Sequence, residues 1–417
     1  MMGSMMRRAM IGDSATLTLD FTTGVLDPRL TFTRASTTAT YINSSGYVTT
    51  AGTDVARFDH DPTTLAPRGL LVEAQATNVL TYSEQFNTAP WTAFSGSITA
   101  NDGVAPDGNT TADSITPSVV NGGVYFSNSF AAGTWTFSVW AKANTGNTLT
   151  ISIDNSSNGR AVAITLSTAT AGTPFVRGTG GTVSSLTVNG VTVFQNSWVR
   201  ISLTVVTTGA NFVAMYNAND TNKILVWGAM LETGSGASSY ISTGASQATR
   251  NADSCVMTGT NFSSWFAGAT EGVLYTQFEK PRSQAGTIGH DHAAVGSQYG
   301  SGTGFTVYAA ASVYYPTTLL WPTGGALFPG GIASAIPNVS KQAGKWFGGN
   351  DATNYANGVQ GTTSAGTGTL APNMLTIGAN SASGTAATRD WLNACVRIVK
   401  FWPVALPDSQ IIALTTP

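Results

Sequence analysis

Two histidines flank an aspartate at His290-Asp291-His292, in a chain that has three histidines in all. Alternate residues of an extended strand share a face, so both imidazoles would lie on the same side. In a three-fold assembly, three such pairs would place six nitrogens around one axial metal. The flanking glycines, and the lack of a further carboxylate or cysteine to complete a closed ligand set, favour a solvated loop instead. Metal binding by His290 and His292 therefore stays an alternative, and we predict no cofactor.

Crowded aromatic and polar residues offer a different chemistry, the binding of a sugar. Sugar rings stack on exposed aromatic side chains, and their hydroxyls need directed polar partners. One stretch supplies both kinds of group: Trp346, Asn350, Asp351, Asn354 and Tyr355. A second, weaker group consists of Tyr314, Tyr315 and Trp321. The competing interpretation is that these rings belong to a core, which we prefer for Trp140, Trp198 and Trp227.

Catalysis finds little support in the sequence. Glycoside hydrolysis needs two carboxylates about 5 to 9.5 Å apart, and no alternating Glu-x-Asp-x-Glu run occurs. Glu271 and Glu279 are candidates in one strand region, but in a fully extended strand they would lie about 27 Å apart. Nucleophile-elbow, phosphate-loop and zinc-protease motifs are also missing from the sequence. We predict that the chain is not an enzyme.

A cluster of charge stands out in a chain that otherwise avoids charge. The run RFDHDPTTLAPRGLLVE holds Arg57, Asp59, His60, Asp61, Arg68 and Glu73. One alternative is a metal or acid/base site at Asp59, His60 and Asp61. We favour a network of salt bridges and turns that fixes a non-repetitive segment, because Asp-Pro pairs commonly form turns. Arg57, Asp59, Asp61 and Arg68 are the residues that we assign to this structural and attachment role.

Composition limits the class of protein. Charged residues make up 10% of the 417 residues, against about 25% in ordinary soluble domains. The net charge of −2 leaves no basic surface for nucleic acid. The N-terminus has no long apolar run after its two arginines, and no stretch approaches the roughly 18 apolar residues of a membrane span. We therefore expect a protein that matures in a cytoplasm, where Cys255 and Cys395 would be buried thiols even if they are neighbours.

The pattern of strands and turns predicts an all-β chain of two tandem β-sandwich, or jelly-roll, domains behind a β-rich N-terminal attachment segment. Residues 1–85 would form that segment, residues 86–250 the first sandwich and residues 251–417 the second. Runs such as GTWTFSVWAKA and KILVWGAMLE alternate with period two, and Asp107-Gly108, Asn121-Gly122 and Asn189-Gly190 mark turns between runs. Asn357-Gly358 is the strongest hairpin signal. The C-terminal LPDSQIIALTTP is the one convincing helical turn.

Three stretches of the chain resemble known families. RASTTATYINSSGYV and RFDHDPTTLAPRGLLVEAQATNVLTYSEQF resemble the N-terminal block of phage structural proteins described as head spikes, head fibres or tail-associated fibres. FSVWAKA, WVRISL, ILVWGAMLE and SSYISTGASQATRNAD are similar to the carbohydrate-binding-module-like sandwich that follows that block. ANGVQ, LTIGAN and VRIVKFWPVALPDSQIIAL resemble the end of concanavalin A-like, laminin-G-type lectin domains, which identifies a fold and says little about a ligand.

The resemblance implies a bacteriophage virion protein: a head fibre, spike or capsid decoration protein. Its N-terminal block would bind the major capsid protein or another virion protein, and its sandwiches would project outward, with host-surface glycans as a further partner. It also implies a homotrimer. One alternative is a tail fibre receptor-binding protein that recognises host glycans, and a second is a capsule polysaccharide depolymerase.

Overall fold

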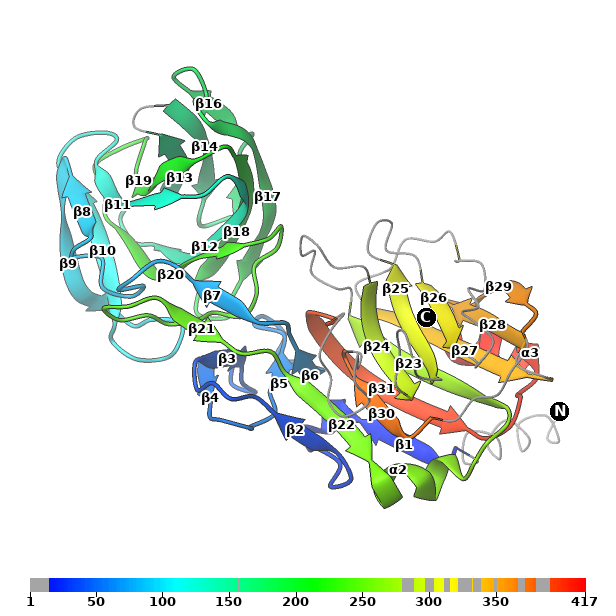
Figure 1. Cartoon of the computed structure of the whole chain (residues 1–417). Helices are drawn as coiled ribbons and strands as arrows, with labels where there is room; N and C mark the ends of the chain where they lie inside the picture. Colours follow the sequence, from blue (N-terminus) through cyan, green and yellow to red (C-terminus); the bar gives the residue numbers. More distant parts are fainter. Residues whose placement is uncertain are drawn as a thin grey trace, which may run out of the picture.

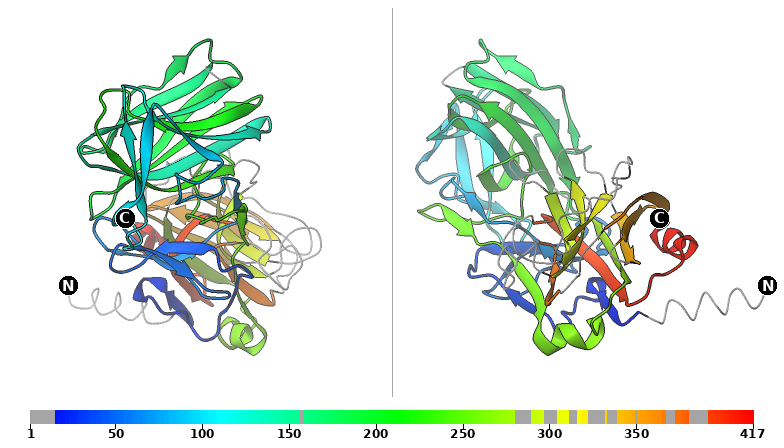
Figure 2. Two further views of the ribbon diagram at one scale, coloured as in Figure 1. Left: turned by 90° about the vertical axis from the view of Figure 1, so that its left-hand side faces the viewer. Right: turned by 45° about the vertical axis from the view of Figure 1, so that its right-hand side comes forward.

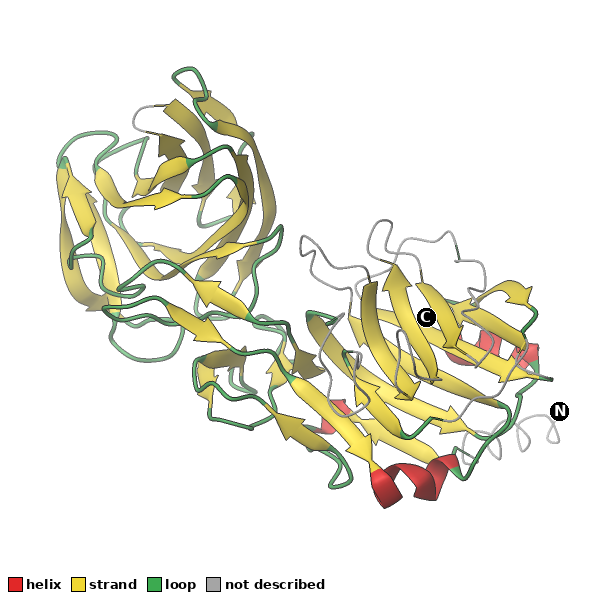
Figure 3. Ribbon diagram, in the orientation of Figure 1, coloured by secondary structure: helices red, strands yellow, loops and turns green. Residues whose placement is uncertain are grey.

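The computed structural model describes residues 15–155, 158–279, 289–296, 304–310, 316–321, 332, 339–348, 351–366, 372–379 and 391–417. These residues form two lobes joined by a neck (Figures 1 and 2). Strands dominate both lobes, and helices are few and short (Figure 3). The predicted all-β class is therefore confirmed. Among the described helices, none is long and apolar enough to cross a membrane.

The middle lobe is a sandwich of two antiparallel sheets. The sheet nearer the neck, here the neck-side sheet, runs in the order β17 (Val183–Val193), β18 (Val199–Thr207), β12 (Gly133–Ala143), β20 (Ile224–Thr233), β10 (Ala112–Pro117) and β9 (Gly96–Gly103). The other, the distal sheet, runs β15 (Thr170–Ala171), β14 (Asn158–Thr165), β13 (Thr148–Asn155), β19 (Ala210–Tyr216), β11 (Gly123–Phe130) and β8 (Trp91–Phe94), and β16 (Phe175–Arg177) also pairs with β14. Alternating apolar side chains of both sheets, among them Phe126, Phe137 and Ile151, form the core between them.

The second lobe is also a sandwich. Its larger sheet runs β29 (Val359–Ser364), β28 (Asp351–Ala356), β27 (Val339–Phe347), β23 (Gly272–Glu279), β31 (Ala394–Trp402), β6 (Pro67–Val72) and β5 (Phe58–His60), and β1 (Leu17–Asp20) pairs with β31. The facing sheet runs β2 (Thr31–Thr33), β22 (Ser254–Thr258), β30 (Met374–Ile377), β24 (Gly289–Gly296), β25 (Gly304–Ala310) and β26 (Pro316–Trp321). One apolar cluster fills the space between these sheets.

The expected N-terminal segment of residues 1–85 is not separate from the second sandwich. Strands β1, β2, β5 and β6 all pair within its two sheets, with partners β31 and β22 far along the chain. The middle lobe is thus inserted into the second sandwich, and the two are not arranged in tandem. Both ends of the insertion meet at the neck, where β7 (Ala76–Asn78) pairs with β21 (Ala248–Arg250). The hairpin of β3 (Ala39–Ile42) and β4 (Val48–Ala51) lies in the same region (Figure 1).

The turns and helices predicted from short sequence signals were confirmed in part. Asn357-Gly358 turns between β28 and β29 with positive φ at both residues, as predicted. Asn189-Gly190 is not a turn, because it lies inside β17 where the register with β18 shifts at a bulge. The predicted C-terminal helix is α3 (Asp408–Thr415). The sequence prediction missed two short elements, the 3-10 helix η1 (Phe21–Thr23) and α2 (Gly259–Phe266).

Candidate functional site

The outer face of the distal sheet gathers aromatic and polar side chains. The strand register determines which side chains lie on this outer face, because alternate residues of a strand share a face. Ile151, Ile153, Val213 and Met215 point into the core, so the residues between them point outward. We call this surface the polar-aromatic face and define it by seven residues: Phe94, Tyr125, Ser152, Asp154, Arg177, Phe212 and Tyr216. The strand that carries Arg177, β16, lies at the end of the lobe far from the neck (Figure 1).

Four aromatic side chains cover one half of the face. Tyr125 contacts Phe212 edge to face, with ring centroids 5.5 Å apart. Phe94 lies 6.0 Å from Tyr125 and 6.4 Å from Tyr216. Small residues opposite these rings, such as Ala214 beside Tyr125, leave the rings standing above the sheet. Phe94, Tyr125 and Phe212 are each partly exposed, so the cluster presents apolar surface to solvent.

The other half of the face is polar and is centred on a pair of opposite charges. Arg177 forms a salt bridge with Asp154, and its Nη1 also donates to Ser152 Oγ at 3.1 Å. Ser152 Oγ donates to Asp154 Oδ2 at 2.6 Å. The guanidinium lies 5.6 Å from the centroid of the Tyr216 ring, which links the polar half to the aromatic half. Arg177 is the exposed member, at 33%, whereas the Asp154 side chain is 2% exposed.

Asp154 is held in an environment that disfavours its charge. Burial raises the pKa of Asp154 above its ordinary value, and the hydrogen bond from Ser152 and the charge of Arg177 reduce that rise without cancelling it. Its Oδ1 oxygen is buried and has no hydrogen-bond partner among the described residues. Space for the carboxylate exists because Gly159 stands opposite on β14, where an added Cβ would lie 2.4 Å from this oxygen. The face therefore has a buried acceptor, the Asp154 carboxylate, beneath the exposed N–H donors of the Arg177 guanidinium.

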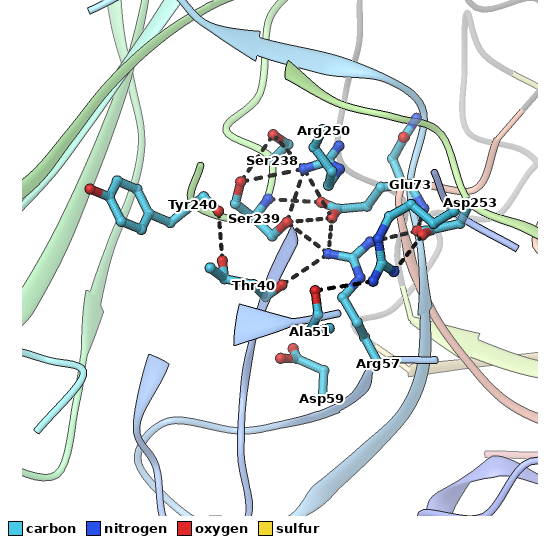
Figure 4. Close-up of polar contacts among 12 residues, drawn as sticks. Thr40, Ala51, Arg57, Asp59, Glu73, Ser238, Ser239, Tyr240, Arg250 and Asp253 are labelled. Atoms are coloured by element: carbon cyan, nitrogen blue, oxygen red, sulfur yellow. Dashed lines mark hydrogen bonds and ion pairs between the residues drawn. The ribbon is translucent and has the colours of Figure 1, made fainter. Parts of the chain in front are cut away.

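Two charged residues of the N-terminal block, Arg57 and Glu73, form a buried cluster with Asp253 and Arg250 at the neck (Figure 4). Arg57 bonds Glu73 Oε2 at 2.8 Å and also pairs with Asp253. Arg34 pairs with Asp253, and Arg250 pairs with Glu73. All five side chains are at most 1% exposed. This neck cluster ties β5 and β6 to the chain that returns from the middle lobe, and the predicted salt-bridge network is confirmed.

Arg57 shows how the cluster is balanced. Burial works against its charged form, but the carboxylates of Asp253 and Glu73 outweigh burial and raise the pKa of Arg57. It also donates to Thr40 O at 2.9 Å and to Ser239 Oγ at 2.8 Å. Glu73 in turn accepts from the Ser239 backbone and hydroxyl. The segments on both sides of the neck therefore meet at one guanidinium.

The remaining charges of the block lie at a cleft between the lobes. The cleft has a volume of about 680 Å³, and its lining includes Asp59, Asp61, Arg68, Asn189, Arg200 and Glu279. Arg68 bonds Asp59 at 3.0 Å and both oxygens of Glu279. Asp61 accepts from the backbones of Thr63 and Thr64 and closes a turn. These charged groups are thus already paired or used in turns. Their predicted role in attachment to a particle stays a prediction.

The predicted sugar site around Trp346 needs correction. Trp346 and Tyr355 are both 0% exposed, so neither presents a ring to a ligand. Trp346 stacks on Phe401 in the core, with centroids 5.6 Å apart. Strands β27 and β28 are covered on both faces, by the core on one side and by α3 on the other, which explains why alternating rings are buried on each side. Asn354 is also buried, Asp351 is partly buried, and Asn350 lies outside the described residues.

Other predicted residues are only partly described. Trp140, Trp198 and Trp227 are core residues, as preferred. His290 and His292 lie in β24, where the register with β25 shifts between Asp291 and Ala293, and their side chains lie outside the described residues. Metal binding by this pair stays a prediction. Within the described part of the chain, no group of three or more His, Cys, Asp or Glu is placed to hold a metal ion. Tyr314, Tyr315 and the Trp321 side chain also lie outside that part.

The two carboxylates considered for catalysis are engaged in other contacts. Glu271 accepts from the Ala405 backbone at 3.2 Å, and Glu279 is bound by Arg68. Cys255 and Cys395 are both buried thiols. Cys255 belongs to the core between the sheets, whereas Cys395 lies between core residues Ala394 and Val396 and so points to the opposite side of its strand.

The sequence prediction missed the polar-aromatic face. The alternation in TLTISIDN and NFVAMYNA did predict strands. The charge of Asp154, on the polar side of the first run together with Ser152, was a usable signal. Arg177 gave no such signal, because β16 has only three residues and reaches Asp154 across the neighbouring strand β14.

Comparisons with known proteins give remote likenesses. No family model matches the chain, and no curated protein matches it. Among solved structures, the chain is similar to the CBM40 module of the Ruminococcus gnavus IT-sialidase bound to α2,3-sialyllactose, at 13% identity and a TM-score of 0.32, over 38% of this chain and 88% of that one. It is also similar to a leech intramolecular trans-sialidase, at 14% identity and a TM-score of 0.30, over 37% and 24%. Mouse laminin α1 domains LG4-5 match at 8% identity and a TM-score of 0.23, over 85% and 95%. Because these identities and TM-scores are low, we infer nothing about the ligand of this chain from these structures.

Proposed function

We propose that this chain is a non-catalytic carbohydrate-binding protein and that the polar-aromatic face holds the sugar. The observation that carries the proposal is the Arg177–Asp154–Ser152 group beside four aromatic side chains on one open sheet face. Pyranose rings present C–H faces that stack on aromatic rings, and their hydroxyls take both donors and acceptors. The aromatic half serves the first need, and the partly exposed Arg177, held in place by Asp154, supplies donors for the second.

A glycan array followed by titration calorimetry tests this proposal. Binding to at least one oligosaccharide is expected, and Tyr125→Ala and Arg177→Ala should each weaken it by about tenfold or more, as expected for truncation of a main contact residue. Arg29→Ala is the matched control for Arg177→Ala, because Arg29 is also 33% exposed and also paired with a nearby carboxylate, that of Asp27. The control should bind like the wild type. Silence across a broad array, or equal binding by all variants, would contradict the proposal.

We further propose that the protein is a component of a bacteriophage particle, as a head fibre, spike or capsid decoration protein. Support comes from the resemblance of RFDHDPTTLAPRGLLVEAQATNVLTYSEQF to the N-terminal block of such proteins and from the low content of charge. A surface of Ser, Thr, Asn and Gly resists nonspecific adhesion. Because residues 15–78 are built into the second sandwich and neck, attachment to a capsid protein would use the exposed surface of that block.

Antibody labelling of particles tests this setting. Signal on heads is expected, whereas signal only on tails would favour the tail-fibre alternative with the same sugar-binding face. A homotrimer is part of the proposal, and sedimentation equilibrium would reveal a mass near three times 43.0 kDa. Incubation with host capsular polysaccharide should release no new reducing ends. Their release would revive the depolymerase alternative.

A further inference from the structure

We propose that the polar-aromatic face selects neutral, hydroxyl-rich glycans and discriminates against glycans that carry a carboxylate. This inference rests on the proposed function and narrows its ligand class. The charges on the face carry it. Across the outward rows of the distal sheet, Arg177 and Asp154 are the only charged residues among those described, so the face is neutral as a whole.

The one cation of the face already has an anionic partner. Arg177 pairs with Asp154 through Nη1, so an incoming carboxylate would have to use another edge of the same guanidinium. That position brings it close to the Asp154 carboxylate, and like charges held that near each other in a partly buried site repel strongly. A sugar hydroxyl has no such conflict, because it carries no charge and can accept a hydrogen bond from Arg177.

Asp154 is a poor neighbour for a second anion. Its side chain is 2% exposed, so water screens it little. The nearby Arg160 does not help, because it stands opposite the core residue Ile153 in the strand pairing and donates its Nε to Val183 O at 3.0 Å. Ser152 is likewise already engaged with Asp154. The arrangement therefore favours one class of ligand by adding repulsion against another.

The experiment compares one sugar in two charge states. The strongest-binding neutral oligosaccharide from the array is oxidised at its primary hydroxyls to the uronic acid form, and both forms are titrated against the full chain. We expect the neutral form to bind at least about tenfold more tightly. Asp154→Asn keeps the size of the side chain and removes its charge, so the preference should fall to within about threefold.

Salt provides a second readout that needs no variant. If repulsion from Asp154 sets the preference, moving from 20 to 500 mM NaCl should change the affinity for the neutral form little. It should narrow the gap between the two forms only in part, because the buried Asp154 carboxylate is poorly screened. Equal or tighter binding of the oxidised form by the wild type at low salt would overturn the inference while leaving the proposed function standing. Failure of both forms to bind would overturn the proposed function and the inference with it.

Discussion

Replacing Arg57 with alanine should destabilise the chain more than any surface change. Arg57 is 0% exposed and makes four bonds, to Thr40 O, Glu73 Oε2, Ser239 Oγ and Asp253 Oδ2. Its loss leaves two buried carboxylates with one guanidinium each, Glu73 with Arg250 and Asp253 with Arg34. Removing one partner of a buried pair costs about 3 to 5 kcal/mol. Because each carboxylate keeps a partner, we expect the lower end of that range, about 3 kcal/mol at pH 7.

Equilibrium denaturation in guanidinium chloride, followed by tryptophan fluorescence, measures this change. The midpoint should fall for Arg57→Ala, and the dependence on denaturant should stay unchanged if only stability is altered. Arg57→Lys keeps the charge but loses the planar fork, so it should give an intermediate loss. Arg29→Ala removes an exposed pair with Asp27 and should cost less than about 1 kcal/mol.

A loss below about 1 kcal/mol for Arg57→Ala would refute the reasoning, because it would mean that the neck cluster is hydrated or dispensable. If the wild type unfolds in one transition and the variant in separate transitions for the two lobes, this result would support the view that Arg57 couples the lobes.

Three further predictions concern other groups. Burial raises the pKa of Glu232 to about 7 from 4.5, so the free energy of unfolding should fall by up to about 3 kcal/mol as pH rises from about 4.5 to about 7. Glu232→Gln should abolish this dependence of stability on pH. If the melting temperature of the variant depends on pH as that of the wild type does, the raised pKa of Glu232 is contradicted. Hydrogen bonds from Lys345 and Tyr355 lower the pKa of Asp408, so Asp408→Asn should cost less than about 1 kcal/mol at pH 7, and the difference should vanish in acid denaturation curves as pH falls below the lowered pKa. Burial, with the charge of Asp253, raises the pKa of Cys255, and Cys395 is buried too; both thiols should resist a thiol reagent until the chain is unfolded, and rapid labelling of the native protein would contradict this.

Local structure was largely predictable from the sequence. Period-two alternation located β12, β18 and β20, and Asn357-Gly358 located a hairpin, because both signals depend on neighbours in the chain. α2 was missed because Phe262, Trp265 and Phe266 give one short helical repeat in a Gly/Ser/Thr-rich run that resembles a loop.

Strand partners and burial were not predictable. Nothing in TLTLD or PRGLLV specifies pairing with residues more than 300 positions away, so the N-terminal block looked separate. Trp346 and Tyr355 looked like a sugar platform because alternation does not reveal that both faces of a strand are covered. The polar-aromatic face depends on Arg177 crossing a neighbouring strand, and sequence spacing does not encode that contact.

A crystal structure of the chain soaked with the strongest neutral oligosaccharide from the array would show whether the polar-aromatic face is the sugar-binding site. We expect sugar density over Tyr125 and Phe212, the partly exposed rings of the face, with hydroxyls within hydrogen-bond distance of Arg177. Density located only elsewhere, for example in the cleft beside Arg68 and Glu279, would contradict it.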